Sequence, residues 1–384
     1  MGNKTQGSAL VAAIFLMATS AIGPGFLTQT AKFTGELGPA FAFAIVISLL
    51  IDIGAQLNIW RIVSLKSKSA TEIANARLPY LGHLLALLIL IGGLGFNIGN
   101  VAGAGLGLNL LLGLEVPWGA FISALLAIVL FSSKNALRGM DLLSKVLGIL
   151  MICLVLYTAF SSNPPLGAAL KNTVWPDKVD FLSIITIVGG TVGGYIAFSG
   201  AHRLLDAGII GPERVGEVSR AAVKGILLTT LMRALLFLAA LGIAEKGLML
   251  EPSNPAASVF VHALGAIGGR VFGVVLWSAA ITSVIGSAYT SISFLKSLHP
   301  TFERYLFRWI AGFIAFSALV FLISGKPAAS VLVWVGAMNG FILPLSLGIM
   351  LLSVRGARYS RLLQFIGWFV VAVMGYFALK VVLG

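Results

Sequence analysis

Long apolar stretches, separated by short polar and often basic segments, run along the chain from end to end. A helix that crosses a bilayer needs about 20 mostly apolar residues. Eleven stretches fit this pattern: residues 8–33, 38–62, 81–113, 117–133, 142–160, 181–204, 219–244, 266–295, 306–323, 330–353 and 362–382. A shorter apolar stretch, residues 256–264, precedes the eighth and predicts an amphipathic helix on the surface. The pattern therefore predicts an all-α polytopic membrane protein.

The composition supports this class and excludes others. Of the 384 residues, 58% are hydrophobic and 10% are charged, whereas soluble domains carry about 25% charged residues. A soluble globule, a disordered tail and a disulfide-stapled secreted module are therefore excluded, and the lipid bilayer is the expected partner. The excess of 26 basic over 13 acidic residues lies mostly between the apolar stretches. It indicates orientation in a membrane rather than binding to nucleic acid.

The distribution of Lys and Arg predicts the orientation, because cytoplasmic loops carry an excess of these residues. When the N-terminus is placed in the cytoplasm, most basic residues fall on the cytoplasmic side, in residues 61–77, 134–145, 203–224, 296–308 and 355–361. We therefore predict an N-terminus inside and, after eleven spans, a C-terminus outside.

Two of the predicted spans are interrupted. The first contains Gly23-Pro24-Gly25, and the sixth contains a glycine-rich run over residues 189–194. A helix break inside a membrane is tolerated where the freed backbone lines a cavity or is buried in protein. Two breaks at corresponding places predict an inverted-repeat transporter with halves at residues 1–160 and 181–353, followed by an eleventh helix at 362–382. The alternative is one kinked helix and one glycine-rich packing face.

The order of these motifs resembles the NRAMP family of divalent-metal transporters over most of the chain. The Asp-Pro-Gly-Asn motif of that family falls on residues 23–26, and its Thr-Val-Met-Pro-His frame falls on residues 191–195. Further support comes from Gln56, Arg61 and the Thr282-Ser283-Val284 run. The resemblance implies a LeuT-like 5+5 inverted repeat in a bacterial cytoplasmic membrane, and secondary transport, here symport, by alternating access. The substrate is expected between broken helices 1 and 6.

The chain departs from the family at the residues that bind metal and carry protons. Gly23, Phe26 and Gly193 stand where the family has its Asp, Asn and Met ligands, so no metal site is predicted. Asn97 and Asn100 replace an Asp and a Glu of the family's proton route, and Tyr195 replaces its His. Asn does not titrate, and Tyr has a reference pKa near 10. The proton-coupled metal mechanism therefore does not carry over residue by residue.

The chemistry of the breaks suggests a solute other than a metal ion. The second half of a broken helix begins with unpaired amides at the positive end of the helix dipole, which favours an anionic or carbonyl-rich solute. Glycine lets a ligand approach the backbone closely, and nearby hydroxyl and amide groups can add hydrogen bonds. The residues predicted to bind substrate are Gly23, Gly25, Phe26, Thr28, Gln29, Thr191, Gly193, Gly194, Tyr195 and Ser199.

Two charges fall inside predicted spans, Asp52 in the second and Arg233 in the seventh. Such charges are costly in a bilayer and are usually paired or functional. One interpretation is a structural Asp52–Arg233 ion pair. The other is that Arg233 balances an anionic substrate while Asp52 is a titratable coupling group. Asn97, Asn100 and Asn339 can line the cavity or bond between helices.

The leading functional hypothesis is a secondary transporter of a small carboxylate. Because some bacterial NRAMP-like proteins are associated with the use of 5-oxoproline, this resemblance suggests that cyclic amido acid as substrate. The alternatives are a transporter of Mg²⁺ or Mn²⁺, held as a hydrated ion by carbonyl and amide oxygens, and a non-transporting membrane scaffold. No enzyme motif and no cofactor motif is visible. Either a proton or Na⁺ is compatible with coupling, and the oligomeric state stays open.

Overall fold

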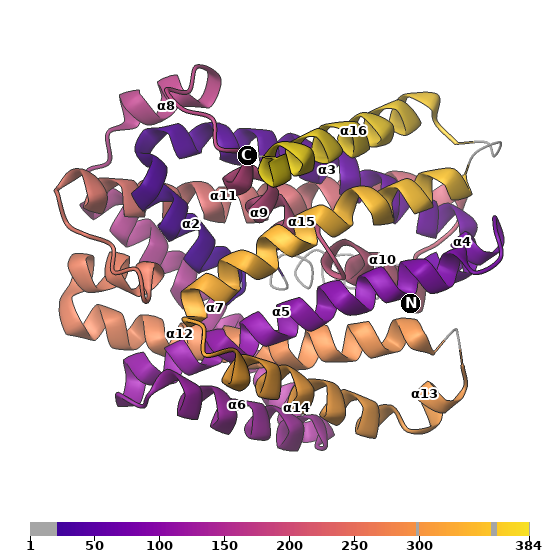
Figure 1. Cartoon of the computed structure of the whole chain (residues 1–384), viewed down its shortest axis with the longest axis horizontal. Helices are drawn as coiled ribbons and strands as arrows, with labels where there is room; N and C mark the ends of the chain where they lie inside the picture. The colour runs from indigo at the N-terminus through magenta and orange to yellow at the C-terminus, as the bar shows by residue number, and fades with distance from the viewer. Residues whose placement is uncertain (1–20, 297–298, 355–358, 384) are drawn as a thin grey trace.

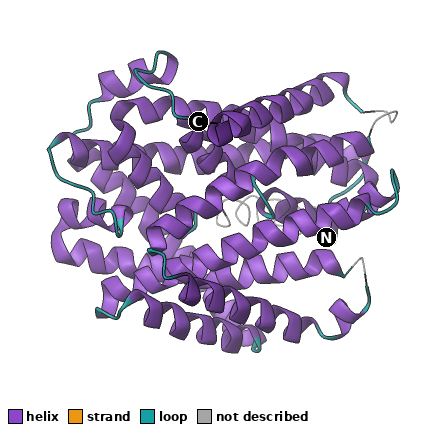
Figure 2. Ribbon diagram, viewed as in Figure 1, coloured by secondary structure: helices purple, strands orange, loops and turns teal. Residues whose placement is uncertain are grey.

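The computed structural model describes residues 21–296, 299–354 and 359–383, with side chains described outside residues 134–145. Within these ranges every regular element is a helix, and most of the long helices run roughly along one axis (Figure 1, Figure 2). This architecture follows from the sequence, because helices satisfy their own backbone hydrogen bonds inside a bilayer. The predicted all-α membrane fold is confirmed.

The first half of the chain forms a set of long helices joined by short turns. In order these are α2 (Pro24–Leu37), η1 (Gly38–Ala40), α3 (Phe41–Lys66), α4 (Ala70–Asn75), α5 (Leu81–Leu112), α6 (Val116–Phe131) and α7 (Lys134–Ser161). The helix α8 (Leu166–Val174) follows as a connector between the two halves. The part of the first predicted span that precedes residue 21 lies outside the described residues.

The second half begins with a helix that is broken in two. The two parts of this helix are α9 (Phe181–Val192) and α10 (Ile196–Asp206). The elements that follow are η2 (Pro212–Arg214), α11 (Val215–Glu245), α12 (Pro255–Leu295), α13 (Thr301–Arg304), α14 (Leu306–Ser324) and α15 (Ala328–Ser353). The last helix is α16 (Arg361–Leu383). Within the described residues, each of the eleven predicted spans falls on one of these helices or on a broken pair.

Length and hydropathy alone identify fewer independent crossings. Among the described residues, eight helical stretches can cross a membrane, with α2, η1 and α3 counted as one stretch and α9 and α10 as another. The pair Val146–Ser161 and Leu166–Val174, bent by 106°, adds a ninth, and α6 is a shorter apolar helix. The eleven-span prediction is larger by two, because it counts α6 as a span and divides the chain at the turn near Gly38, where φ is 55°.

The short helix predicted on the surface is placed differently by the structure. Residues 256–264 form the start of α12, separated from its remainder by a kink at Gly265 with φ 67°. Ala256, Val259 and Phe260 are buried, and the Phe260 ring stacks on Phe272 at a centroid distance of 4.4 Å. The separate helix is therefore present, but its first turns pack into the protein instead of lying on the surface.

Close packing of α5 fixes the position of the first break. A Cβ atom added to Gly107 would lie 2.7 Å from the backbone nitrogen of Trp277 on α12, and Gly103 packs directly against Pro24 at the start of α2. Small residues allow helix backbones to approach this closely in membranes. The start of α2 is thereby held against the middle of α5.

Candidate substrate site at the broken helices

The first break has space beside its backbone. Gly23 is extended (φ −104°, ψ −173°), and Pro24 begins α2, where a missing amide hydrogen costs nothing. The first amides of α2 have no partner within the helix. A Cβ atom on Gly23 would lie 3.5 Å from Ser283 Oγ and 3.6 Å from Asn100 Oδ1, which is ordinary contact.

The second break is tightly packed. Helix α9 ends at Val192, and α10 begins at Ile196 after Gly194 with φ 53°, a conformation that favours glycine. A Cβ atom on Gly193 would lie 2.7 Å from the backbone oxygen of Asn339, and Gly194 touches the Asn339 side chain. The sequence predicts that glycine admits a ligand at both breaks. In this structure another helix, α15, occupies that space at the second break.

Three buried side-chain amides, which we call the amide cluster, lie on helices α2, α5 and α15, which pack against one another near the breaks. Gln29 Nε2 donates to Leu332 O at 2.8 Å, Asn97 Nδ2 donates to Val284 O at 2.7 Å, and Asn339 Nδ2 donates to Val335 O at 2.9 Å. A carbonyl oxygen can only accept, so these contacts fix which end of each amide is nitrogen. The amide oxygens of Gln29, Asn97 and Asn339 are buried without a hydrogen-bond partner. The site therefore offers free acceptors as well as helix amides.

A row of serines on α12 completes this polar region and was not predicted. Ser283, Ser287 and Ser291 repeat every four residues and so share one helix face. Ser287 Oγ accepts from Asn97 Nδ2 at 2.9 Å, and Ser291 packs against Gly93 of α5. The four-residue spacing inside an apolar span is the sequence signal that could have found them.

The charge of Arg233 on α11 lies between the two broken helices. Its guanidinium carbon is 4.3 Å from the centroid of the Phe26 ring on α2, and its Nη1 donates to Thr191 Oγ1 of α9 at 2.9 Å. Nη1 also donates to Ile187 O at 3.3 Å. Its Nε and Nη2 atoms are buried without a partner. These two nitrogens form one edge of the guanidinium, the fork that binds a carboxylate with two parallel hydrogen bonds.

The carboxylate of Asp52 on α3 is also buried, and neither of its oxygens has a hydrogen-bond partner. It adjoins Thr191 and interacts electrostatically with Arg233, but it makes no direct ion pair with it. Within the described part of the chain, the ion pairs closer than 4.0 Å are Lys32–Glu36, Lys171–Asp177 and Arg214–Glu217. The interpretation as a direct structural ion pair is therefore wrong for this structure.

The other predicted substrate residues are buried but partly engaged with their own helices. The hydroxyl of Thr191 donates to Ile187 O at 2.7 Å, and that of Ser199 donates to Ile196 O at 2.9 Å. Thr28 is buried in α2, and the Tyr195 ring packs edge-on against Phe96 with centroids 5.4 Å apart. Arg233, Asp52, Ser291 and the amide cluster keep unused hydrogen-bonding capacity.

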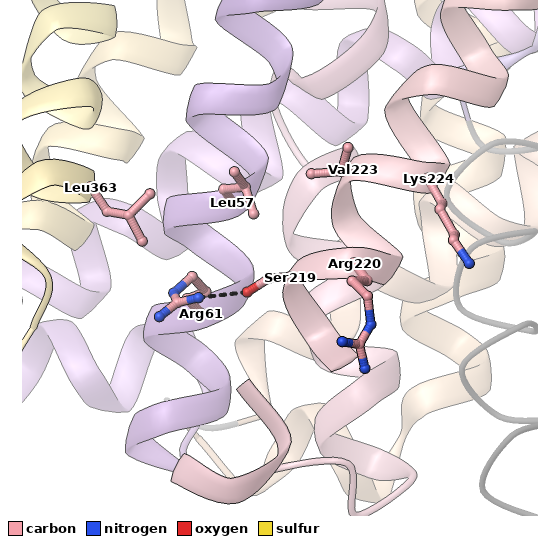
Figure 3. A pocket seen from close by; sticks show the side chains of 7 residues that line it. All are labelled: Leu57, Arg61, Ser219, Arg220, Val223, Lys224 and Leu363. Carbon is pink, nitrogen blue, oxygen red and sulfur yellow. Dashed lines mark hydrogen bonds between the residues drawn. The ribbon is translucent and has the colours of Figure 1, made fainter. Parts of the chain in front are cut away.

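Two further observations concern metal-ligating side chains and a surface groove. In the parts of the chain that the structure describes, no three His, Cys, Asp or Glu side chains lie close enough to hold a metal ion. The groove of about 430 Å³ in Figure 3 lies elsewhere, between α3, α11 and α16. Arg61, Arg220 and Lys224 line it, and Arg61 Nη1 donates to Ser219 Oγ at 2.7 Å.

Comparison with known proteins agrees with the resemblance in the motifs. A family model described as natural resistance-associated macrophage protein-like matches residues 14–384. An uncharacterized membrane protein of Haemophilus influenzae is 51% identical over 382 residues, covering 98% of this chain and 96% of its own. The membrane protein YcsG of Bacillus subtilis, also uncharacterized, is 53% identical over 346 residues, covering 90% and 85%.

Solved structures agree on the fold. The Eremococcus coleocola manganese transporter is 16% identical, with a TM-score of 0.72 over 99% of this chain and 87% of its own. MhsT, solved with L-phenylalanine, is 15% identical, with a TM-score of 0.64 over 95% and 98% of the two chains. Mhp1, a nucleobase-cation-symport-1 family transporter, is 18% identical, with a TM-score of 0.58 over 89% and 76%. These solved proteins share the LeuT-like fold, and at such low identity the likeness concerns the fold alone.

Proposed function

The chain belongs to the natural resistance-associated macrophage protein-like family, and on that premise we propose that it is a secondary transporter of a small carboxylate such as 5-oxoproline. The observation that carries this proposal is the free hydrogen-bonding edge of the buried Arg233 guanidinium. Its buried guanidinium touches both broken helices through Phe26 and Thr191, and its Nε–Nη2 edge is free. A buried cation with an unused fork is matched in charge and shape by a carboxylate.

The amide cluster supports a solute with both donors and acceptors. 5-Oxoproline carries a carboxylate, a lactam N–H and a lactam carbonyl. Its carboxylate fits the Arg233 edge, and its N–H can donate to one of the free oxygens of Gln29, Asn97 or Asn339. Its carbonyl can accept from the unpaired amides at the start of α2. A site that bonds each polar group in this way rejects analogues that lack one of them.

A second candidate function, transport of Mg²⁺ or Mn²⁺, is favoured by one observation. The three free oxygens of the amide cluster are hard ligands of the kind that Mg²⁺ and Mn²⁺ accept, and Mg²⁺ readily keeps part of its water shell. The proximity of the Arg233 cation opposes this function, because like charges repel strongly where water is excluded.

One experiment in proteoliposomes separates these functions. Uptake of labelled 5-oxoproline, Mn²⁺ and Mg²⁺ is measured in vesicles from the same preparation, with Arg233→Gln as the variant. The proposal expects uptake of 5-oxoproline that the variant abolishes, with no uptake of either metal. Metal uptake without organic uptake would replace the proposal with the second candidate. A protein that moves none of the three would favour a scaffold.

A matched pair at Gly23 sharpens this test, since the structure leaves space there. Gly23→Asp adds an anion beside the start of α2, and Gly23→Asn adds nearly the same volume without charge. We expect Gly23→Asp to weaken 5-oxoproline uptake well beyond Gly23→Asn, because the new carboxylate competes with the solute for the same positive groups. Equal effects of the two variants would show that negative charge at this break does not affect binding of the transported solute.

A further inference from the structure

The proposed substrate site leaves Asp52 without a role. Its side chain is 0% exposed, and neither of its oxygens has a hydrogen-bond donor. Burying an ionised carboxylate without hydrogen bonds is strongly unfavourable. Asp52 therefore fits this arrangement as a neutral acid, or it awaits a partner that it does not contact here. The cation that acts on Asp52 electrostatically is Arg233, and its Nε–Nη2 edge is unused.

We propose that Asp52 binds the proton that drives transport, and that it competes with the substrate carboxylate for Arg233. This inference rests on the proposed function. In the empty transporter, ionised Asp52 turns to the free edge of Arg233 and pairs with it. When the solute arrives, its carboxylate takes that edge, and Asp52 accepts a proton. On release the proton leaves Asp52, and the pair forms again.

The charges balance at every step. Ionised Asp52 with Arg233 carries no net charge, whereas protonated Asp52 with Arg233 carries one positive charge. A bound carboxylate cancels that charge, so the loaded site is again neutral. Proton and solute therefore favour each other's binding, and by linkage each raises the affinity for the other equally. A neutral empty site and a neutral loaded site can both rearrange without moving charge through the membrane.

No other ionisable group disturbs this exchange at the described elements packed on α3. Helices α9 and α15 contain no Asp, Glu, His, Lys or Arg. On α11 the nearest other charged residue, Lys224, is nine positions from Arg233, or about 13 Å along the helix. Several charged side chains of the remaining neighbours are paired: Lys32 with Glu36, Glu72 with Ser69, Lys171 with Asp177, and Arg214 with Glu217. The others lie in the short η2 or in the end turns of α10 and α16: Glu213, His202, Arg203, Asp206, Arg361 and Lys380.

The contacts of Arg233 link protonation of Asp52 to the two broken helices. Arg233 reaches Thr191 two positions before Gly193 and Phe26 one position after Gly25. When Asp52 pairs with the free Nε–Nη2 edge, Arg233 gains a contact on α3 beside those that it makes with Thr191 on α9 and Phe26 on α2. Protonation thereby biases how the two broken helices are held together, which is a local charge change acting on a two-state element.

The proton site can be tested without any substrate. Purified protein in nanodiscs is titrated by infrared difference spectroscopy as wild type, Asp52→Asn, Asp52→Glu and Asp206→Asn. Asp206 is an exposed carboxylate at the end of α10 and provides a matched control. We expect a band from a dry protonated carboxyl that disappears as pH rises in wild type and Asp206→Asn, shifts in Asp52→Glu, and is missing in Asp52→Asn. A spectrum without a titrating band that depends on Asp52 would overturn the proposal.

Transport in proteoliposomes gives the second readout, with a pH-sensitive dye inside the vesicles and labelled 5-oxoproline outside. Wild type and Asp206→Asn should acidify the interior by one proton per solute, with a rate that is insensitive to membrane potential. Asp52→Asn, which mimics the neutral acid, should still exchange labelled for unlabelled solute but should no longer concentrate it. Uphill uptake by Asp52→Asn, or uptake that follows a Na⁺ gradient instead, refutes the coupling role. A titrating band without any 5-oxoproline uptake refutes the substrate and leaves the proton site standing.

Discussion

At the scale of single residues, the two breaks differ in what surrounds their glycines. The motif resemblance places Gly23 and Gly193 where the family has metal ligands, and neither residue has a positive φ. A Cβ atom on Gly23 meets its neighbours at 3.5 Å or more, whereas one on Gly193 lies 2.7 Å from the backbone oxygen of Asn339. A larger side chain fits at the first break, but at the second it meets backbone atoms of both α9 and α15.

Substitution by alanine measures this difference directly. We expect Gly193→Ala to destabilise the protein by about 1–3 kcal/mol through overpacking, and Gly23→Ala to change stability little. Thermal unfolding of the purified protein in one detergent compares the two variants. Equal melting temperatures for Gly193→Ala and Gly23→Ala would contradict the packing described for the second break.

Arg233 provides a second test at this scale. Arg233→Lys keeps the charge but loses the planar fork, so a carboxylate would have one contact where it had two. We expect the affinity for 5-oxoproline to fall by about tenfold or more, equivalent to at least about 1.4 kcal/mol, while Mn²⁺ uptake stays at background. The measurement is the concentration dependence of uptake in vesicles of equal protein content. An unchanged KM would show that the fork does not hold the solute.

At the scale of elements, the short helix α4 secures one end of α10. Ser69 and Glu72 form a capping box, with Glu72 N donating to Ser69 Oγ at 3.3 Å and Ser69 N donating to Glu72 Oε2 at 2.9 Å. The next amide, Ala70 N, donates to His202 Nε2 of α10 at 3.5 Å. The box therefore holds α4 in a position where it contacts the second half of the broken helix.

The capping box predicts a pH dependence. The hydrogen bond from the Ser69 hydroxyl lowers the pKa of Glu72 below its ordinary value. A carboxyl whose folded pKa is lowered stabilises the fold above its unfolded pKa, and this contribution is lost as pH falls through the folded pKa. We expect hydrogen-exchange protection of α4 to weaken on acidification in wild type, and to be weaker and flat with pH in Glu72→Gln. The same slope in the variant would assign the pH effect to another group.

At the scale of the whole molecule, the orientation in the membrane remains a prediction from the distribution of charge. The basic groove of Arg61, Arg220 and Lys224 gathers residues from the ends of α3 and α11 (Figure 3). The positive-inside rule places such a cluster in the cytoplasm. Lys178, exposed in the segment between α8 and α9, is then on the outer side.

Cysteine labelling tests this orientation. The exposed Cys153 is first replaced by Ala, and single cysteines are then introduced as Lys224→Cys and Lys178→Cys. In intact bacterial cells, an impermeant maleimide should label the Lys178 position and spare the Lys224 position until the membrane is opened. The reverse pattern would invert the topology and place the N-terminus outside.

How much was predictable depends on whether a feature is local in sequence. The breaks at Gly23-Pro24-Gly25 and near Gly194 are predictable because proline and glycine interrupt helices wherever they stand. The contact of Arg233 with Phe26 and Thr191 is not, because it depends on how α11 is rotated against two helices distant in the chain. The interpretation of Asp52 and Arg233 as a direct ion pair was wrong for the same reason, because opposite charges in two spans do not fix the distance between them.

The most direct test of the central claim is a cryo-EM map of the protein in nanodiscs, prepared with 5-oxoproline and separately with Mn²⁺. We expect density for the organic solute between α2 and the α9–α10 break, with its carboxylate within hydrogen-bond distance of Nε and Nη2 of Arg233. Density for a dehydrated cation in direct contact with the backbone at Gly23 and Gly193, with the Arg233 edge still empty, would contradict this expectation.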